Sequence, residues 1–115
     1  MYFFFALLIK HAIVDLGVQS HFKGLDKLRY ISNAHIHYFH HGISTFLIAL
    51  YFTSLHFAVV SAVIDYVAHW HIDYSKHQIN TRFNIEARSI TWWWTSSADA
   101  ALHFLTYFII ILIGV

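Results

Sequence analysis

Hydrophobic and polar positions are segregated along this chain into long blocks. Four strongly apolar segments are separated by shorter stretches in which polar residues gather. Each apolar segment is close to the ~20 residues that an α-helix needs to cross the hydrocarbon core of a bilayer. We therefore predict four helices, at about residues 2–20, 33–53, 55–77 and 91–115.

The connections between these segments predict how the helices are arranged. The link between the second and third helices, near Phe52 to Leu55, is so short that these helices must be antiparallel neighbours. The chain contains no proline that would break a helix. We predict an all-α fold with a single domain over residues 1–115, built as an up-and-down four-helix transmembrane bundle.

Composition supports a membrane protein and excludes several classes of function. Of the 115 residues, 58% are hydrophobic and only 11% are charged, which is too apolar for an ordinary soluble domain. The absence of cysteine excludes disulfides and thiolate metal sites. The net charge of +1 gives no basic surface for nucleic acid, so membrane lipids are the expected partners.

Basic residues predict the orientation of the bundle in the membrane. Six of the seven fall in or beside the two longer connections: Lys23, Lys27, Arg29, Lys76, Arg82 and Arg88. By the positive-inside rule these basic loops are cytoplasmic, which leaves both termini outside. Trp92, Trp93 and Trp94 suit an aromatic belt at the cytoplasmic end of the fourth helix. Asn33 and Thr91 are the expected helix N-caps.

Each predicted helix also carries two ionisable residues one turn apart. Residues at positions i and i+4 lie on the same face of a helix. Ionisable groups at membrane depth usually face the interior of a bundle and mark a functional site. The pairs are His11 with Asp15, His37 with His41, His69 with Asp73, and Asp99 with His103.

The order of residues within the pairs reverses when the direction of the helix reverses. The first and third helices read His then Asp, whereas the fourth reads Asp then His. Antiparallel packing therefore brings the three aspartates to one level and their histidines to the next. We predict one layer of Asp15, His37, Asp73 and Asp99, and a second layer of His11, His41, His69 and His103.

These eight side chains suggest a metal centre that opens toward the cytoplasm. Imidazole nitrogen and carboxylate oxygen are ligands for zinc, iron and manganese, and helix bundles build such sites from several helices. We expect one or two divalent ions, with zinc as the first choice and some of the eight residues acting as hydrogen-bond partners of the ligands. The alternative is a set of interhelical hydrogen bonds, which average only ~0.6 kcal/mol each in membranes.

A bound metal would support hydrolysis. It would lower the pKa of its water, and one of Asp15, Asp73 and Asp99 would act as general base. Lys76, together with Lys23, would orient an anionic lipid or another phosphate-bearing substrate, although both lysines also suit anchors that reach the membrane interface.

The polar face is expected to end soon beyond the pairs. Asp65 extends the stripe of His69 and Asp73 by one further turn, and Gln19 extends that of His11 and Asp15. The outer halves of the helices carry little else that is polar, which argues against proton or ion transport. Only Ser44, Thr45 and Thr106 interrupt the apolar run there.

Four motifs in order resemble a known family. They are His11 to Gln19 followed by Lys23, His37-x3-His41, His69 to Lys76, and Asp99 to His103. This pattern resembles the small phage and bacterial membrane proteins grouped as domain of unknown function 3307, although Ala100 stands where that family has glutamine. The resemblance implies a viral or bacterial protein of the bacterial (host) inner membrane. The chain is also distantly similar to membrane-bound proteins described as metal-dependent hydrolases, which is an analogy.

Other functions remain open at this point. One is a non-enzymatic phage membrane factor, for host-envelope remodelling or superinfection exclusion. In that case the cage formed by the eight paired histidines and aspartates is structural. Another is binding of haem or another tetrapyrrole, against which the aspartates in three of the pairs argue. The sequence leaves open the metal, the substrate, the protein partners and whether the chain forms a homo-oligomer.

Overall fold

The computed structural model describes residues 2–18, 28, 30–86 and 89–114. Over these residues the protein is helical and contains no strand, which confirms the predicted all-α class. The elements are α1 (Tyr2–Ala12), the π-helical η1 (Ile13–Val18), α2 (His35–Phe52), α3 (Leu55–Arg82) and α4 (Ile90–Gly114).

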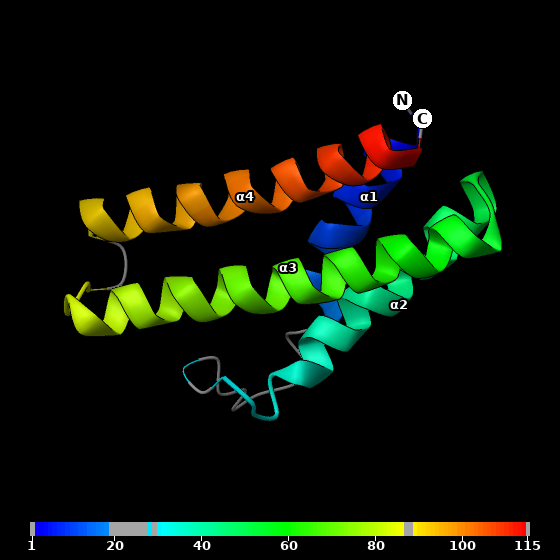
Figure 1. Cartoon of the computed structure of the whole chain (residues 1–115). Coiled ribbons are helices and arrows are strands. Elements are labelled where there is room, and N and C mark those ends of the chain that lie inside the picture. Colours follow the sequence, from blue (N-terminus) through cyan, green and yellow to red (C-terminus); the bar gives the residue numbers. More distant parts are fainter. Residues whose placement is uncertain (1, 19–27, 29, 87–88, 115) are drawn as a thin grey trace.

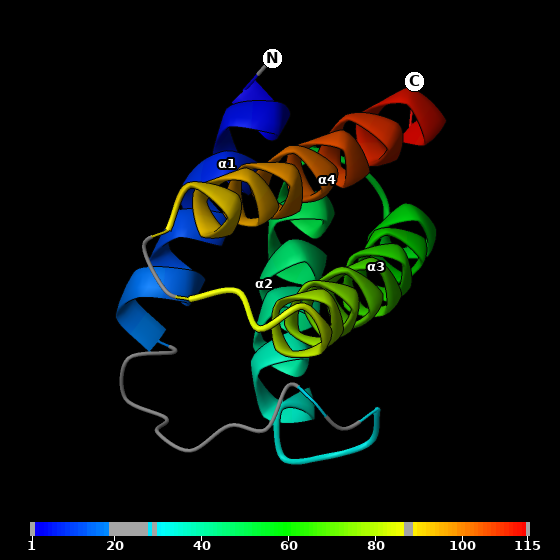
Figure 2. The same ribbon diagram turned by 90° about the vertical axis from the view of Figure 1, so that its left-hand side faces the viewer.

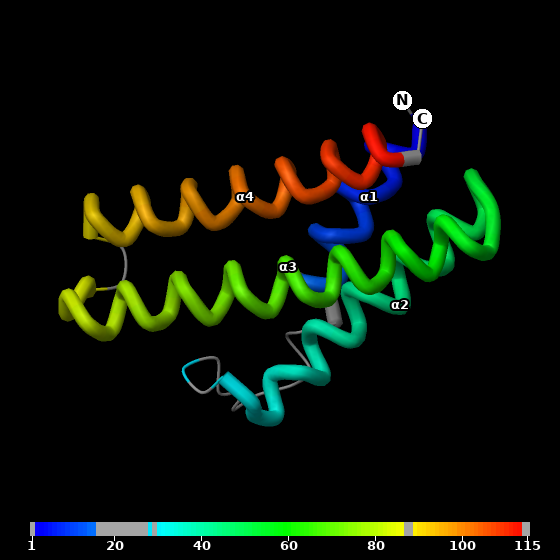
Figure 3. The backbone as a smooth tube through the Cα atoms, in the orientation of Figure 1, coloured from blue at the N-terminus to red at the C-terminus, as the bar shows by residue number. Residues whose placement is uncertain are grey.

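The four α-helices pack in a closed order around a shared interior. α1 contacts α2 and α4, and α3 packs against the same two helices (Figure 2). α3 and α4 run in opposite directions as long neighbouring rods that extend beyond α1 and α2 (Figures 1 and 3). The chain therefore places side chains from all four helices around one interior.

An apolar cluster fills one end of this interior. Its buried members are Leu7, Tyr107 and Ile110. The partly buried side chains packed against them come from the start of α1, the end of α2, the start of α3 and the end of α4: Phe3, Phe4, Leu8, Ile48, Phe57, Ile64 and Ile111. Because starts and ends of successive helices meet here, the helices alternate in direction, and the ionisable pairs lie farther along the bundle.

Two stretches of helix differ from the predictions. α3 continues to Arg82 rather than ending at residue 77, since no glycine or proline interrupts this stretch. Asn84, with φ of 51°, adopts the left-handed conformation that terminates a helix. The first helix is not α-helical throughout, because π-helical geometry replaces it from Ile13 to Val18. π-Helical turns are rare in proteins, and those that do occur often lie at functional sites. The one in this chain contains Asp15.

Both predicted N-caps are wrong. Ala34 occupies the N-cap of α2 without a side-chain hydrogen bond. In α4, Thr91 lies inside the helix, and Ser89 Oγ instead accepts a hydrogen bond from the backbone N–H of Trp92 at 3.1 Å. A one- or two-residue error of this kind is expected where serine and threonine lie close together, because either side chain can cap a helix.

Two of the described helices are long and apolar enough to cross a membrane. They are α3, over Leu55–Arg82, and α4, over Ile90–Ile113. α1 and α2 are shorter, with 11 and 18 α-helical residues. Length and composition therefore single out only half of the four predicted spans.

Candidate metal centre

Four imidazoles, one from each helix, meet inside the bundle. The ring of His11 lies 4.9–5.3 Å, between centroids, from the rings of His41, His69 and His103. His41 stacks on His69 at 3.6 Å, and His69 lies 4.0 Å from His103. The described structure thus contains the predicted histidine layer. The close stacking also leaves no room for a tetrapyrrole between His41 and His69.

Asp15 is held by imidazoles at hydrogen-bond distance. His41 Nε2 lies 2.8 Å from Asp15 Oδ1, and His11 Nε2 lies 2.9 Å from Oδ2. His37 Nε2 is slightly farther away, at 3.3 Å from Oδ1. The Asp15 side chain is 34% exposed, so this carboxylate sits at the edge of the cage. Each of its two oxygens therefore contacts a histidine directly: Oδ2 contacts His11 of α1, and Oδ1 contacts His41 of α2.

Asp73 also faces three imidazoles, but at greater distances. His103 Nε2 lies 3.6 Å from Asp73 Oδ1, while the Nε2 atoms of His37 and His69 lie 3.8 and 3.9 Å from Oδ2. These distances exceed those of hydrogen bonds. They suit ligand atoms that share an ion, because two atoms each ~2.1 Å from a metal are at most ~4.2 Å apart.

The protonation of His103 can be assigned from its partners. Its Nδ1 lies 2.8 Å from the carbonyl oxygen of Asp99, which can only accept, so Nδ1 carries the proton. In the neutral ring Nε2 is then an acceptor, and it faces the carboxylate of Asp73. Two such atoms facing each other in a buried site could share a cation.

Several buried ring nitrogens have no hydrogen-bond partner within the described part of the chain. They are both nitrogens of His37, Nδ1 of His69 and Nε2 of His103. These side chains are at most 2% exposed. Leaving such a group unsatisfied costs about 1–3 kcal/mol. His69 Nδ1 faces Asp65 Oδ1 at 3.7 Å, which is beyond hydrogen-bond distance.

All eight residues predicted as metal ligands fall into three groups that could hold an ion. Within each group the ligand atoms lie within 4.8 Å of one another. The groups are His11, Asp15, His41 and His69; His37, His69 and Asp73; and Asp73, Asp99 and His103. The described structure therefore contains buried His/Asp groupings suited to a metal, and Asp73 belongs to two of them.

Lys76 and Asp99 lie at an edge of the centre, and both are partly exposed. Lys76 Nζ is 3.7 Å from Asp99 Oδ2, and their side chains are 23% and 18% exposed. A largely apolar pocket of about 110 Å³ between α3 and α4 is lined by both residues, together with Ile72, Ser75, Ile79, Thr95, Ala98 and Leu102. Two further predicted residues, Lys23 and Gln19, lie outside the described residues.

A polar cluster beyond the histidine layer was not predicted from the sequence. Lys10 Nζ lies 2.8 Å from Asp65 Oδ2 and 3.0 Å from both His41 Nδ1 and the hydroxyl of Tyr107. Thr45 donates to the same oxygen of Asp65. The prediction that Ser44, Thr45 and Thr106 alone interrupt the apolar run was therefore wrong. Helical spacing offered a signal for three members: Asp65 lies one turn before His69, Thr45 one turn after His41, and Tyr107 one turn after His103. Lys10 alone followed from no such spacing.

Comparisons with protein-family models, curated proteins and solved structures find no match to this chain. The resemblance to domain of unknown function 3307 therefore stays a prediction. The geometry of the His/Asp groups is thus the basis for inferring a function.

Proposed function

We propose that this chain is a multi-pass membrane protein that holds a divalent metal ion on Asp73 and hydrolyses a lipid or headgroup-linked substrate. The observation that carries the proposal is the pair of facing acceptors, His103 Nε2 and Asp73 Oδ1, at 3.6 Å. A cation between them would replace a repulsive contact with two ligand bonds. Membership of the domain of unknown function 3307 family, in the bacterial inner membrane, belongs to the same proposal.

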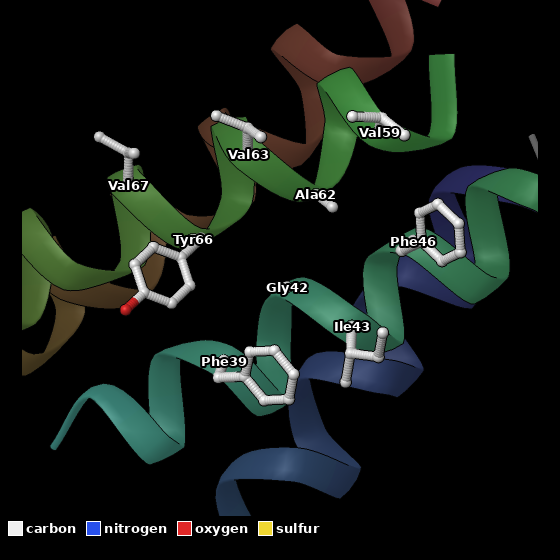
Figure 4. Close-up of a pocket in the computed structure, with 9 residues that line it drawn as sticks. All are labelled: Phe39, Gly42, Ile43, Phe46, Val59, Ala62, Val63, Tyr66 and Val67. Atoms are coloured by element: carbon white, nitrogen blue, oxygen red, sulfur yellow. The ribbon is translucent and has the colours of Figure 1, made fainter. Parts of the chain in front are cut away.

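The distribution of polarity across the bundle supports membrane insertion of all four helices. Ionisable side chains gather in the interior, whereas large apolar side chains cover the outside. Such exposed residues occur on every helix: Phe5 and Ile9 on α1, Phe39 and Leu47 on α2, Val59 and Val63 on α3, and Leu105 and Leu112 on α4. Phe39, Val59 and Val63 are labelled in Figure 4. A lipid environment would remove the cost of exposing them to water.

The proposed ligands are the nitrogen and oxygen atoms that face Asp73 or belong to it. They come from His37 on α2, His69 and Asp73 on α3, and His103 on α4. A mixed set of imidazoles and carboxylates suits zinc, and also iron or manganese. Because Asp73 belongs to two groups, its carboxylate could bridge two ions.

The edge of the centre provides what hydrolysis requires. When bound, the metal supplies an acidified water and a Lewis acid for the substrate oxygen. Asp99, partly exposed beside the pocket, accepts the proton of the attacking water. Lys76 binds the anionic group of the substrate. This arrangement favours a phosphate-bearing lipid or headgroup over a neutral substrate.

Metal analysis of the protein purified in detergent tests the first part of the proposal. We expect zinc, iron or manganese at one or two ions per chain, and their loss in Asp73→Asn. Protein that stays metal-free in the presence of all three metals would overturn the proposal.

Hydrolysis of phosphate-bearing lipids tests the second part. Loss of hydrolysis in Asp99→Asn with the metal retained supports catalysis, whereas a metal-loaded but inactive wild type identifies a structural centre.

Topology can be tested separately because the chain has no cysteine. Single cysteines would be placed at two exposed positions, His56→Cys near the start of α3 and Glu86→Cys between α3 and α4. An impermeant thiol reagent should label them from opposite sides of the membrane, with Glu86→Cys reached from the cytoplasm. Labelling of both from one side would contradict the proposed four spans.

A further inference from the structure

One ammonium group lies at the centre of the buried cluster beyond the histidines. Lys10 is 5% exposed, and its Nζ contacts three acceptors: Asp65 Oδ2 at 2.8 Å, His41 Nδ1 at 3.0 Å and the Tyr107 oxygen at 3.0 Å. An ammonium carries three protons and cannot accept a hydrogen bond. Each proton of Lys10 therefore has one partner, and the charge is balanced by Asp65.

The contact with Lys10 determines the tautomer of His41. Since Lys10 only donates, His41 Nδ1 must accept, and the proton of the neutral ring resides on Nε2. That Nε2–H points to Asp15 Oδ1 at 2.8 Å. His41 is therefore a bridge that receives a hydrogen bond from Lys10 and donates one to Asp15.

His11 is oriented by the same ammonium through Tyr107. The Tyr107 oxygen accepts from Lys10, so its own proton is available to His11 Nδ1, which lies 2.7 Å away. His11 Nδ1 thus accepts, and Nε2–H donates to Asp15 Oδ2 at 2.9 Å. Both oxygens of Asp15 receive a histidine proton whose location depends on Lys10.

We infer that Lys10 is a positioning residue that fixes the tautomers of His11 and His41 together and thereby holds Asp15. A further step rests on the proposed function. While this network is intact, the Nε2 lone pairs of His11 and His41 are occupied by protons, so these two predicted ligands support the centre rather than bind the metal. Metal binding falls to the imidazoles around Asp73.

The tautomers can be read directly by nuclear magnetic resonance. Full-length, metal-free protein in detergent micelles would carry ¹⁵N-labelled histidine, with resonances assigned from His11→Gln and His41→Gln. Long-range ¹⁵N–¹H correlations distinguish a protonated ring nitrogen from an acceptor. We expect His11 and His41 each to show one dominant tautomer with the proton on Nε2.

Three variants separate the links of the network. Tyr107→Phe should convert His11 to a mixture of tautomers and leave His41 unchanged, whereas Lys10→Met should affect both rings. Tyr66→Phe is the matched control: its hydroxyl lies 2.5 Å from His35 Nδ1, so only His35 should respond. If Lys10→Met does not fold, the wild type and Tyr107→Phe still decide. A proton on Nδ1 of either ring, or an unchanged His11 in Tyr107→Phe, would overturn the inference.

Zinc added to the same sample distinguishes this inference from the proposed function. Perturbation of His37, His69 and His103, with the His11 and His41 tautomers retained, supports both. No response to zinc would remove the proposed metal centre while leaving the tautomer assignment intact. Displacement of the Nε2 protons of His11 and His41 would reject the step that excludes them as ligands.

Discussion

Asp15 and Asp73 are two carboxylates in similar surroundings that make different contacts. Each faces the Nε2 atoms of three histidines, and His37 lies between the two. Around Asp15 the nitrogen–oxygen distances are 2.8–3.3 Å, whereas around Asp73 they are 3.6–3.9 Å. The two shortest contacts of Asp15, with His41 and His11, are at hydrogen-bond distance, whereas the distances around Asp73 suit ligand atoms that share a cation.

The two carboxylates differ because the Nδ1 atoms of the histidines around them have different hydrogen-bond partners. The Nδ1 atoms of His11 and His41 accept hydrogen bonds from Tyr107 and Lys10, so their Nε2 atoms donate to Asp15. His103 donates its Nδ1 proton to a backbone carbonyl, so its Nε2 is an acceptor. The partner of one ring nitrogen therefore determines what the other can bind, which no inventory of histidines and aspartates reveals.

The largest expected effect comes from exchanging each carboxylate for an amide. Asp73→Asn should abolish stoichiometric metal binding, because it removes a charged ligand from the centre. Asp15→Asn should weaken binding by no more than about 10–100-fold, as expected of a residue that supports ligands. Metal content and competition with a chromophoric chelator measure both variants. Equal losses in the two variants would remove the distinction between the two carboxylates.

The next effect concerns the two lysine–aspartate pairs. Lys10→Met leaves Asp65, only 1% exposed, as an uncompensated buried charge and should cost about 3–5 kcal/mol of stability. The matched Lys76→Met breaks a more exposed pair, with side chains 23% and 18% accessible, and should cost no more than about 1 kcal/mol. Unfolding titrations in detergent measure the difference. A small effect of Lys10→Met would mean that Asp65 is not charged.

Metal addition should stabilise the fold by a predictable amount. At a free concentration of about 100 times Kd, an ion that binds only the folded state adds about 2.7 kcal/mol. We expect this gain in the wild type and none in Asp73→Asn, measured by thermal unfolding with and without a chelator. A chelator that leaves the wild-type unfolding temperature unchanged argues against a resident metal.

The smallest effect distinguishes two buried threonines. Thr45 donates to the buried carboxylate of Asp65, so Thr45→Val should cost about 1.5–3 kcal/mol. Thr106 donates to the carbonyl of Leu102 one turn earlier in its own helix, so Thr106→Val should cost no more than about 1 kcal/mol. The same unfolding titrations compare the two variants. A larger cost for Thr106→Val would show that the Lys10 cluster adds little stability.

Much of the helical arrangement could be predicted from residue order. The reversal from His69–Asp73 to Asp99–His103 predicted that the histidines would meet at one level, and the ring contacts of His11, His41, His69 and His103 agree. The helix ends were harder to predict. Side chains compete to cap an end, and the spacing of the pairs did not predict the π-helical stretch that contains Asp15.

By itself the sequence determined which side chains share a helix face, because helical periodicity is local and spacings of four residues are visible in one dimension. It also determined that these faces are buried, since ionisable groups on apolar helices have no other favourable place. Only the tertiary structure decided which ring nitrogen meets which partner. Lys10 reaches His41, Asp65 and Tyr107 across three helix interfaces. Which ring nitrogen of a histidine carries the proton depends on such contacts, over distances of about 3 Å. These contacts form only when helices that are far apart in the chain pack together.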